Sequence, residues 1–201
     1  MIVNRRNCSR GLFAAGFFTF LLSLQPIQAN EPETVVLFLN GNQISAGFAG
    51  ESSPRFSMPA AVATSGGSGP IGMQRPKTLY GQQAVDSGGS NLTYAVQAGR
   101  IVDFNAFKKL VSHMLNQKLG VDPTEIALVM NESSASTDSE REQTTRMMFE
   151  SFGLPYFFMS PHFQSFSQIS EMASRSTFRE ALITKDEYDE KGAGIIHQKS
   201  N

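Results

Sequence analysis

The sequence predicts an α/β domain in which helices pack on a mixed sheet, and three features indicate it. A buried-looking strand at residues 34–39 precedes Asn40-Gly41-Asn42, and Asn-Gly is a strong signal for a turn to an antiparallel return strand, here at 43–48. Apolar residues three to four positions apart mark residues 104–119 as a helix. The apolar run at 125–130 is typical of a buried parallel strand.

Length, composition and charge narrow the possible classes of protein. The chain has 201 residues, which is enough for one domain and short for two, and 40% of them are hydrophobic, enough for a packed core. Its 17 basic and 18 acidic residues give a net charge of -1, which argues against a nucleic-acid partner. A single cysteine, Cys8, excludes a disulfide framework within the chain and a cysteine-based metal site.

The first 29 residues have the layout of a secretory signal peptide. Three arginines precede an uncharged apolar run at 11–24, and Pro26 and Ala29 follow it. This run is shorter than the roughly 20 residues that span a bilayer. We therefore expect cleavage near Ala29, a mature domain of residues 30–201, and a secreted or exported protein that meets the membrane only during export. The alternatives are an uncleaved anchor, a misplaced start codon, or a protein of the cytoplasm or cytoskeleton.

The other elements follow in chain order. A third strand is expected at 56–62, before a flexible Gly/Ser loop at 64–70 and a weakly packed excursion at 71–97. Asp103 is placed to cap the helix at 104–119, and Gly120 is placed to end it. The rest of the chain predicts a helix at 136–152, a strand at 156–160, a helical stretch at about 164–182 and a polar tail at 185–201.

Three antiparallel strands followed by parallel strand-helix units describe a ribonuclease-H-like layout. Any other small mixed α/β domain is the alternative. No internal repeat is visible in the sequence.

Three segments carry a resemblance to a known family. Residues 46–55 (AGFAGESSPR) resemble the actin segment AGFAGDDAPR, residues 145–155 (TRMMFESFGLP) resemble TQIMFETFNTP, and residues 185–199 (KDEYDEKGAGIIHQK) resemble the actin ending KQEYDESGPSIVHRK. These matches lie in family order. The chain is thus similar to the actin and actin-related superfamily, whose domains have the actin-like ATPase version of the ribonuclease-H-like fold.

The resemblance implies one half of the usual actin duplication. The match follows the family to about residue 168 and then jumps to the C-terminal helix and tail, so the chain resembles an internally deleted actin. It implies subdomain 1 with a subdomain-2-like excursion at about 63–98. The second phosphate-binding loop of the family lies in the part that has no counterpart here.

The resemblance places a remnant phosphate loop at Asn40, Gly41 and Ser45. Actins have an Asp near the metal where this chain has Leu39, or Phe38 in another alignment, and a Lys where this chain has Ser45. We therefore expect no cofactor, with ATP and Mg as the expectation if the family function is retained. The plain alternative is that these residues form only a hairpin turn.

His162 falls where actins have the Gln that positions water, and a His can exchange a proton near neutral pH. A surface or capping role for His162 is the simpler interpretation. A ribonuclease-H-type nuclease would need several carboxylates around metal ions. Glu132 is a candidate for such a site, whereas Asp103 and Asp138 are better placed as helix-start residues and Leu39 leaves no acid on the first strand. An enzyme is therefore not the leading expectation.

The resemblance also implies a surface for partners of subdomain 1. Its candidate residues share the region that corresponds to the last actin helix and tail: Arg175, Thr177, Phe178, Ala181 and Tyr188. The leading hypothesis is a non-catalytic, exported interaction module that binds actin or an actin-binding protein. The alternatives are a nucleotide-binding, filament-forming cytoskeletal protein and a degenerate actin remnant.

Overall fold

A six-stranded sheet forms the centre of the fold, in the order β11-β10-β9-β1-β2-β3. The computed structural model describes residues 32–65, 76–88 and 91–199. The strands of this sheet are β1 (Glu33–Asn40), β2 (Gln43–Phe48), β3 (Phe56–Pro59), β9 (Ile126–Asn131), β10 (Tyr156–Ser160) and β11 (Ile183–Thr184).

The strand directions confirm the predicted ribonuclease-H-like layout. β1, β2 and β3 form an antiparallel meander, and β9 and β10 then join β1 in parallel. The short β11 closes the far edge as an antiparallel partner of β10. Because β1, β9 and β10 are parallel, their carboxyl ends lie at one edge of the sheet.

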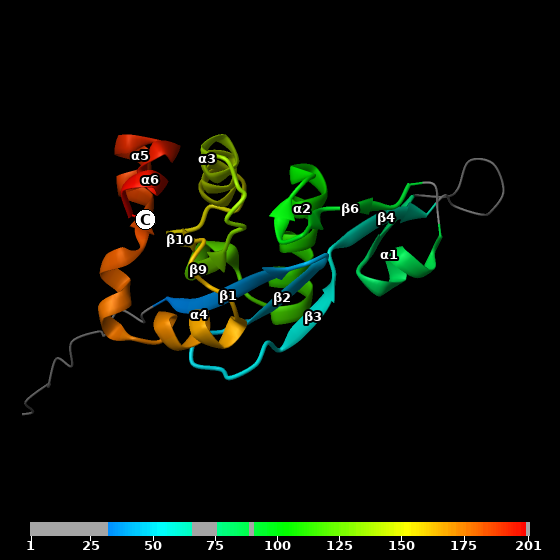
Figure 1. The fold of residues 1–201 in the computed structure, drawn as a ribbon, viewed down its shortest axis with the longest axis horizontal. Helices are drawn as coiled ribbons and strands as arrows, with labels where there is room; N and C mark the ends of the chain where they lie inside the picture. The colour runs from blue at the N-terminus through cyan, green and yellow to red at the C-terminus, as the bar shows by residue number, and fades with distance from the viewer. Residues whose placement is uncertain (1–31, 66–75, 89–90, 200–201) are drawn as a thin grey trace, which may run out of the picture. The chain divides into compact units, whose positions relative to one another are not determined.

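Helices cover both faces of this sheet because the buried strands are apolar on both sides (Figure 1). On β1, Val35 and Leu37 face one core, whereas Val36 faces the other. The first core includes residues of α2 (Phe104–Ser112), of the C-terminal helices and of the helical turn that directly follows α3 (Asp138–Arg146). The second core is closed by α4 (Phe166–Ala173) and by the 3₁₀ segment η4 (Ser176–Ala181).

Both long helices occur where the sequence predicts them, with details that the pattern does not contain. Asp103 caps α2 by accepting a hydrogen bond from the Ala106 amide at 2.8 Å, and Gly120 ends the helix at a φ of 73°. The second halves of both helices are π-helical, in η1 (His113–Leu119) and η3 (Met147–Ser151). Thr137 and Glu140 form a reciprocal cap at the start of α3.

The predicted strand at 56–62 is wrong as a single element. β3 ends at Pro59, which lacks a backbone donor, and the chain leaves the main sheet at Ala60. The following strand, β4 (Ala61–Ser65), belongs to a second sheet with β5 (Lys77–Tyr80) and β6 (Thr93–Tyr94). β9 is preceded by a short 3₁₀ turn, η2 (Pro123–Glu125).

The excursion predicted to be weakly packed at 71–97 has more structure than expected. α1 (Gln82–Asp86) packs on β4, and Ala61, Ala63 and Ala84 form a small core of their own. Two further short strands, β7 (Val96–Gln97) and β8 (Arg100–Ile101), pair with each other. The glycines of the predicted loop at 66–69 lie outside the described residues.

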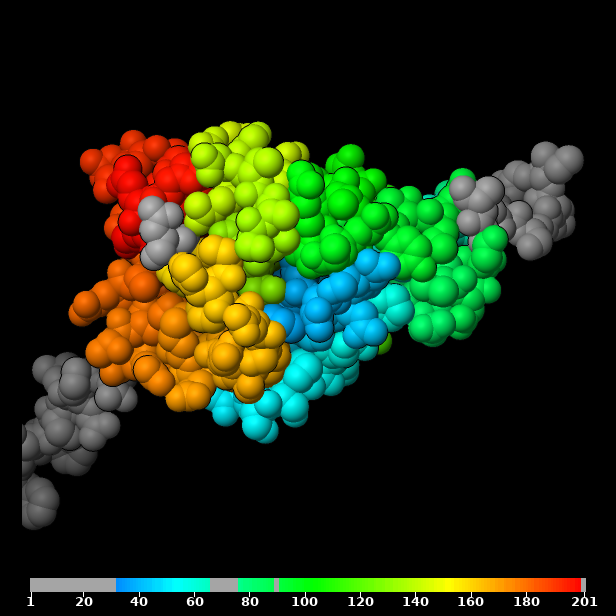
Figure 2. Space-filling view, in the orientation of Figure 1, coloured from blue at the N-terminus to red at the C-terminus, as the bar shows by residue number. Residues whose placement is uncertain are grey.

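The C-terminal segment also departs from the expectation of a polar tail. It forms α5 (Lys185–Lys191), η5 (Ala193–Ile195) and α6 (Ile196–Lys199). Tyr188, Ile195 and Ile196 are buried in the first core. The segment lies against α3, as Figure 2 shows from the surface. The predicted helical stretch at 164–182 is likewise divided between α4 and η4.

The predicted signal peptide at residues 1–29 lies outside the described residues. Among the residues that are described, no helix is long and apolar enough to cross a membrane.

Candidate functional site

The carboxyl ends of β1, β9 and β10 gather the residues singled out from the sequence. Ligands of open α/β sheets bind outside this edge. β1 leads here into the turn at Asn40, β9 into Glu132, and β10 into Ser160 and His162. The backbone amide of Glu132 donates to the Ser160 carbonyl at 3.1 Å, which holds the last two of these ends together.

The turn between β1 and β2 is the predicted remnant phosphate loop. Asn40 and Gly41 are exposed, and Gly41 has the left-handed φ of 57° that such a turn requires. The carbonyl of Gly41 accepts a hydrogen bond from the Gly99 amide at 2.8 Å, and this bond holds the turn against the segment at Gly99. The Ser45 hydroxyl donates to the Ser57 hydroxyl at 3.0 Å on the neighbouring strand. The described contacts of this turn are therefore structural.

Asn131, which the sequence reading did not single out, clamps the end of β1. Its Oδ1 accepts from the Leu39 amide at 2.7 Å, and its Nδ2 donates to the Leu39 carbonyl at 2.8 Å. Both residues are buried. The clamp continues the β1–β9 ladder beyond its last paired residues, Leu37 and Met130. The sequence does contain a signal for this contact, because Asn131 is the polar last residue of the otherwise apolar strand β9.

Glu132 is the buried acid of this edge. Its side chain is 5% exposed, and its Oε1 lies 3.0 Å from Nε of Arg141 on α3. Its Oε2 has no hydrogen-bond partner among the described residues. Burial raises the pKa of the Glu132 carboxyl above its ordinary value, although Arg141 acts in the opposite direction. The pair is a charged contact inside the fold.

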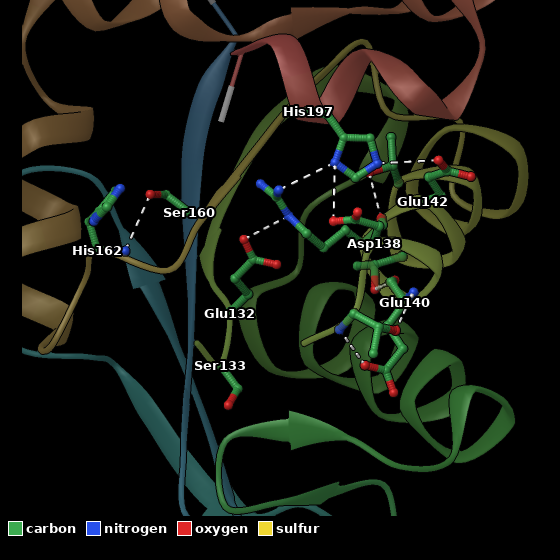
Figure 3. A network of polar contacts seen from close by, with 12 residues as sticks. Glu132, Ser133, Asp138, Glu140, Glu142, Ser160, His162 and His197 are labelled. Atoms are coloured by element: carbon green, nitrogen blue, oxygen red, sulfur yellow. Dashed lines mark hydrogen bonds and ion pairs between the residues drawn. The ribbon is translucent and has the colours of Figure 1, made fainter. Parts of the chain in front are cut away.

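A polar network joins this pair to the C-terminus (Figure 3). His197 of α6 lies with Nδ1 at 3.4 Å from Nη1 of Arg141 and with Nε2 at 3.2 Å from Oε1 of Glu142. Asp138 is 3.7 Å from the same ring. The network therefore links the end of β9, the start of α3 and α6.

His162 lies apart from that network. Its backbone amide donates to the Ser160 hydroxyl at 3.3 Å, and this backbone contact is the one drawn for His162 in Figure 3. The residue is exposed at the rim of a shallow depression of about 370 Å³, which Glu132, Ser133 and Asp138 also line. The structure thus places His162 at this edge of the sheet without a described polar partner for its ring.

The carboxylates needed by a nuclease do not converge. Asp103 and Asp138 stand at the starts of α2 and α3, as predicted, and Leu39 is the β1 residue beside Asn131. Within the described part of the chain, no group of three or more His, Cys, Asp or Glu side chains is arranged to hold a metal ion. Glu132 is engaged by Arg141 instead.

The space between the turn and α3 is nearly filled. Leu39, Asn131 and Glu132 line it, and Arg100 closes it through a bidentate ion pair with Glu140 on α3. Its volume is about 10 Å³, room for about one water molecule. The described residues leave no cleft here for a larger ligand.

The predicted partner-binding residues divide into two groups. Arg175 and Thr177 are exposed, and Ala181 is partly exposed. Phe178 is buried edge-on against Phe158, with ring centroids 5.1 Å apart.

Tyr188 is also buried, stacked on Phe149 with centroids 4.5 Å apart. Its hydroxyl donates to Oε1 of Glu150 at 2.7 Å. Burial and this carboxylate raise the pKa of Tyr188 to about 12.

A comparison with known protein families gives one match. The family model described as Actin matches residues 29–170, which is more than half of the chain. The matched range includes the main sheet except β11, the excursion and the site edge described above.

Proposed function

Because the chain belongs to the actin family, we propose that it acts as a non-catalytic interaction module that binds actin or an actin-binding protein. One observation carries the proposal: the space between the β1–β2 turn and α3, at the edge where the family holds ATP, is nearly filled by the chain's own contacts. Leu39, which one of the two alignments places at the family's metal-side Asp, is buried and clamped by Asn131.

The residues present at this edge do not fit Mg-ATP. Triphosphate and metal together need cations and a carboxylate near the turn. Here the turn offers neutral side chains, and Ser45 bonds to Ser57 where the family has a cation. The nearby arginines Arg100 and Arg141 are paired with Glu140 and Glu132.

The surface of α4 and η4 supplies the proposed contact. Arg175, Thr177 and Ala181 are accessible there, and the exposed neighbours Arg179 and Glu180 add charges of both signs. Phe178 supports this surface from below by packing on Phe158. A polar, mixed-charge surface over an apolar base suits a reversible protein contact.

Binding of purified actin and of profilin, each measured separately by pull-down on the immobilised chain, tests the proposal. We expect Arg175→Glu to weaken the bound fraction severalfold. Arg55→Glu is the matched control, because both arginines are exposed and both pair with a Glu four residues earlier. No capture of either protein, or equal loss in both variants, would overturn the proposed surface.

The family's usual activity is the second candidate function, favoured by the family match itself. It predicts micromolar, Mg-dependent ATP binding, whereas our proposal predicts none. Titration with a fluorescent ATP analogue separates the two. A degenerate remnant would fail both the titration and the pull-down.

Export is a separate proposal, supported by the arginines and the apolar run of residues 1–29. N-terminal sequencing of protein from an exporting host is the test. We expect a first residue at or near Asn30, and a soluble cytoplasmic protein that retains Met1 would contradict export.

A further inference from the structure

A second hollow lies away from the site edge, where β3 of the main sheet meets the excursion and the π-helical turn η1. β3 and α1 lie beside each other there (Figure 1). The hollow has a volume of about 290 Å³, at the lower end of the range for ligand pockets and sufficient for one large side chain. It shares one residue with the turn at the site edge, Ser57, whose hydroxyl accepts from Ser45.

Its walls combine aromatic and apolar side chains with the polar side chains of Ser57, Gln82 and Gln83. The rings of Tyr80 and His113 stack in parallel, with centroids 4.2 Å apart and planes 7° apart. Met58 and Met114 complete the floor. Phe56 stands at the rim with 37% of its surface exposed, one of two large hydrophobic residues exposed within the described residues. Covering such a surface with an apolar group is favourable, because apolar area is removed from water.

Its charge has one sign. Lys118 is exposed and lines the hollow, and no Asp or Glu among the described residues does. The closest acid on α1, Asp86, accepts a hydrogen bond from Gln82. Burial, and to a smaller extent Lys118, lowers the pKa of His113, so this ring is neutral at pH 7. A ligand with a carboxylate next to its apolar group therefore complements the hollow.

The neighbouring strand favours a peptide as that ligand. β3 is the last strand of the main sheet, and no described strand pairs with its outer side. Edge strands of this kind accept extended peptides through main-chain hydrogen bonds, while a side pocket supplies specificity. Three residues of the hollow come from η1, and π-helical turns are frequent at functional sites.

We propose that this hollow binds an extended peptide segment of a partner protein, with one bulky apolar side chain between Phe56 and the Tyr80–His113 stack and an adjacent carboxylate at Lys118. This surface is separate from the α4–η4 surface. The peptide-binding proposal can therefore be tested independently of the proposed function.

The probes are three capped tetrapeptides added to the isotope-labelled full chain: Thr-Phe-Asp-Thr, Thr-Phe-Lys-Thr and Thr-Ala-Asp-Thr. Amide chemical shifts report both the location and the strength of binding. We expect the first peptide to shift the resonances of Tyr80, His113 and Lys118 in a saturable way. The other two peptides should bind at least about fivefold more weakly than the first. Equal responses to all three, shifts confined to other surfaces, or no saturable shift would overturn the proposal.

Two variants with matched controls sharpen the test. Lys118→Glu should weaken binding of the acidic peptide by about fivefold, whereas Lys109→Glu, an exposed lysine of the same helix outside the hollow, should not. Phe56→Ala should weaken it by a similar factor, and Val102→Ala, the other exposed large hydrophobic residue, is its control. A spectrum unchanged elsewhere verifies that each variant is folded. Equal affinity in a variant and its control would contradict the assigned contact.

Discussion

At the residue scale, the side-chain amide of Asn131 holds the end of β1 against the end of β9 at the site edge. Asn131 supplies a donor and an acceptor to the backbone of Leu39, and both residues are buried. It thereby satisfies two main-chain groups at the point where the β1–β9 ladder ends. Because Asn131 occupies the amide and the carbonyl of Leu39, this amide cannot at the same time donate fully to a phosphate.

Replacing this amide should be costly. Asn131→Ala leaves two buried backbone groups without partners, so we expect the free energy of unfolding to fall by about 2–4 kcal/mol. Urea denaturation monitored by circular dichroism measures the change. Asn116→Ala is the control, because Asn116 is exposed and bonds only to Ser112 among the described residues, and it should stay within about 0.5 kcal/mol of the parent. Equal midpoints for the two variants would refute the clamp.

Tyr188 provides a titration that can be followed directly. The chain has four tyrosines, and burial beside Glu150 raises the pKa of Tyr188 to about 12. Absorbance of phenolate should therefore show one tyrosine that ionises later than the ordinary value of about 10. Tyr188→Phe should remove that late step and leave the others unchanged.

The same shift has a consequence for stability. Because the folded-state pKa of Tyr188 is higher than the unfolded-state pKa, stability is retained below about pH 10 and is lost as the pH rises toward 12. Tyr188→Phe should lose less stability than the parent across that interval. Parallel slopes for the two proteins would show that this phenol is not protected by the fold.

At the scale of elements, the sequence predicted those whose signal is local. The hairpin at Asn40-Gly41 and the helix from Asp103 to Gly120 depend on short-range patterns, and both are present. The break at Pro59 and the second sheet depend on pairing between short strands distant in sequence, such as β4 with β6, which no periodicity reveals. The π-helical turns also leave no pattern of their own.

The site was predictable to a similar extent. The sequence and the family resemblance singled out Asn40, Glu132 and His162, and the parallel strands bring them to one edge of the sheet. The ion pair of Glu132 with Arg141 and the clamp by Asn131 required knowledge of side-chain direction. The burial of Tyr188 follows from polar and apolar residues alternating on short helical turns, in a segment whose composition predicted a polar tail.

The C-terminal helices should be essential for folding. Removing residues 185–201 takes Tyr188, Ile195 and Ile196 out of the core. Each large buried side chain contributes about 1.5–3 kcal/mol, against a total stability of roughly 5–15 kcal/mol. We expect the truncated chain to lose its cooperative thermal transition in circular dichroism.

Point variants keep this prediction testable if the truncated chain cannot be purified. Ile195→Ala should cost about 2–4 kcal/mol, because Ile195 is 1% exposed. Gln198→Ala, at an exposed position of α6, should cost little. A truncated chain that melts at the temperature of the parent would show that the segment is dispensable.

At the scale of the whole molecule, we expect no ordered filament under conditions that polymerise actin. By family resemblance, filament growth needs contacts from both halves of the duplication and a bound nucleotide. The described residues build one main sheet and leave almost no space between the β1–β2 turn and α3. Negative-stain microscopy with Mg-ATP and salt is the measurement, with purified actin as the positive control. Dimers or amorphous aggregates are compatible with this expectation, because a half-fold exposes groups that its other half would cover. Helical filaments that form only when Mg-ATP is present would contradict it, and would also favour the nucleotide-binding function over the interaction module.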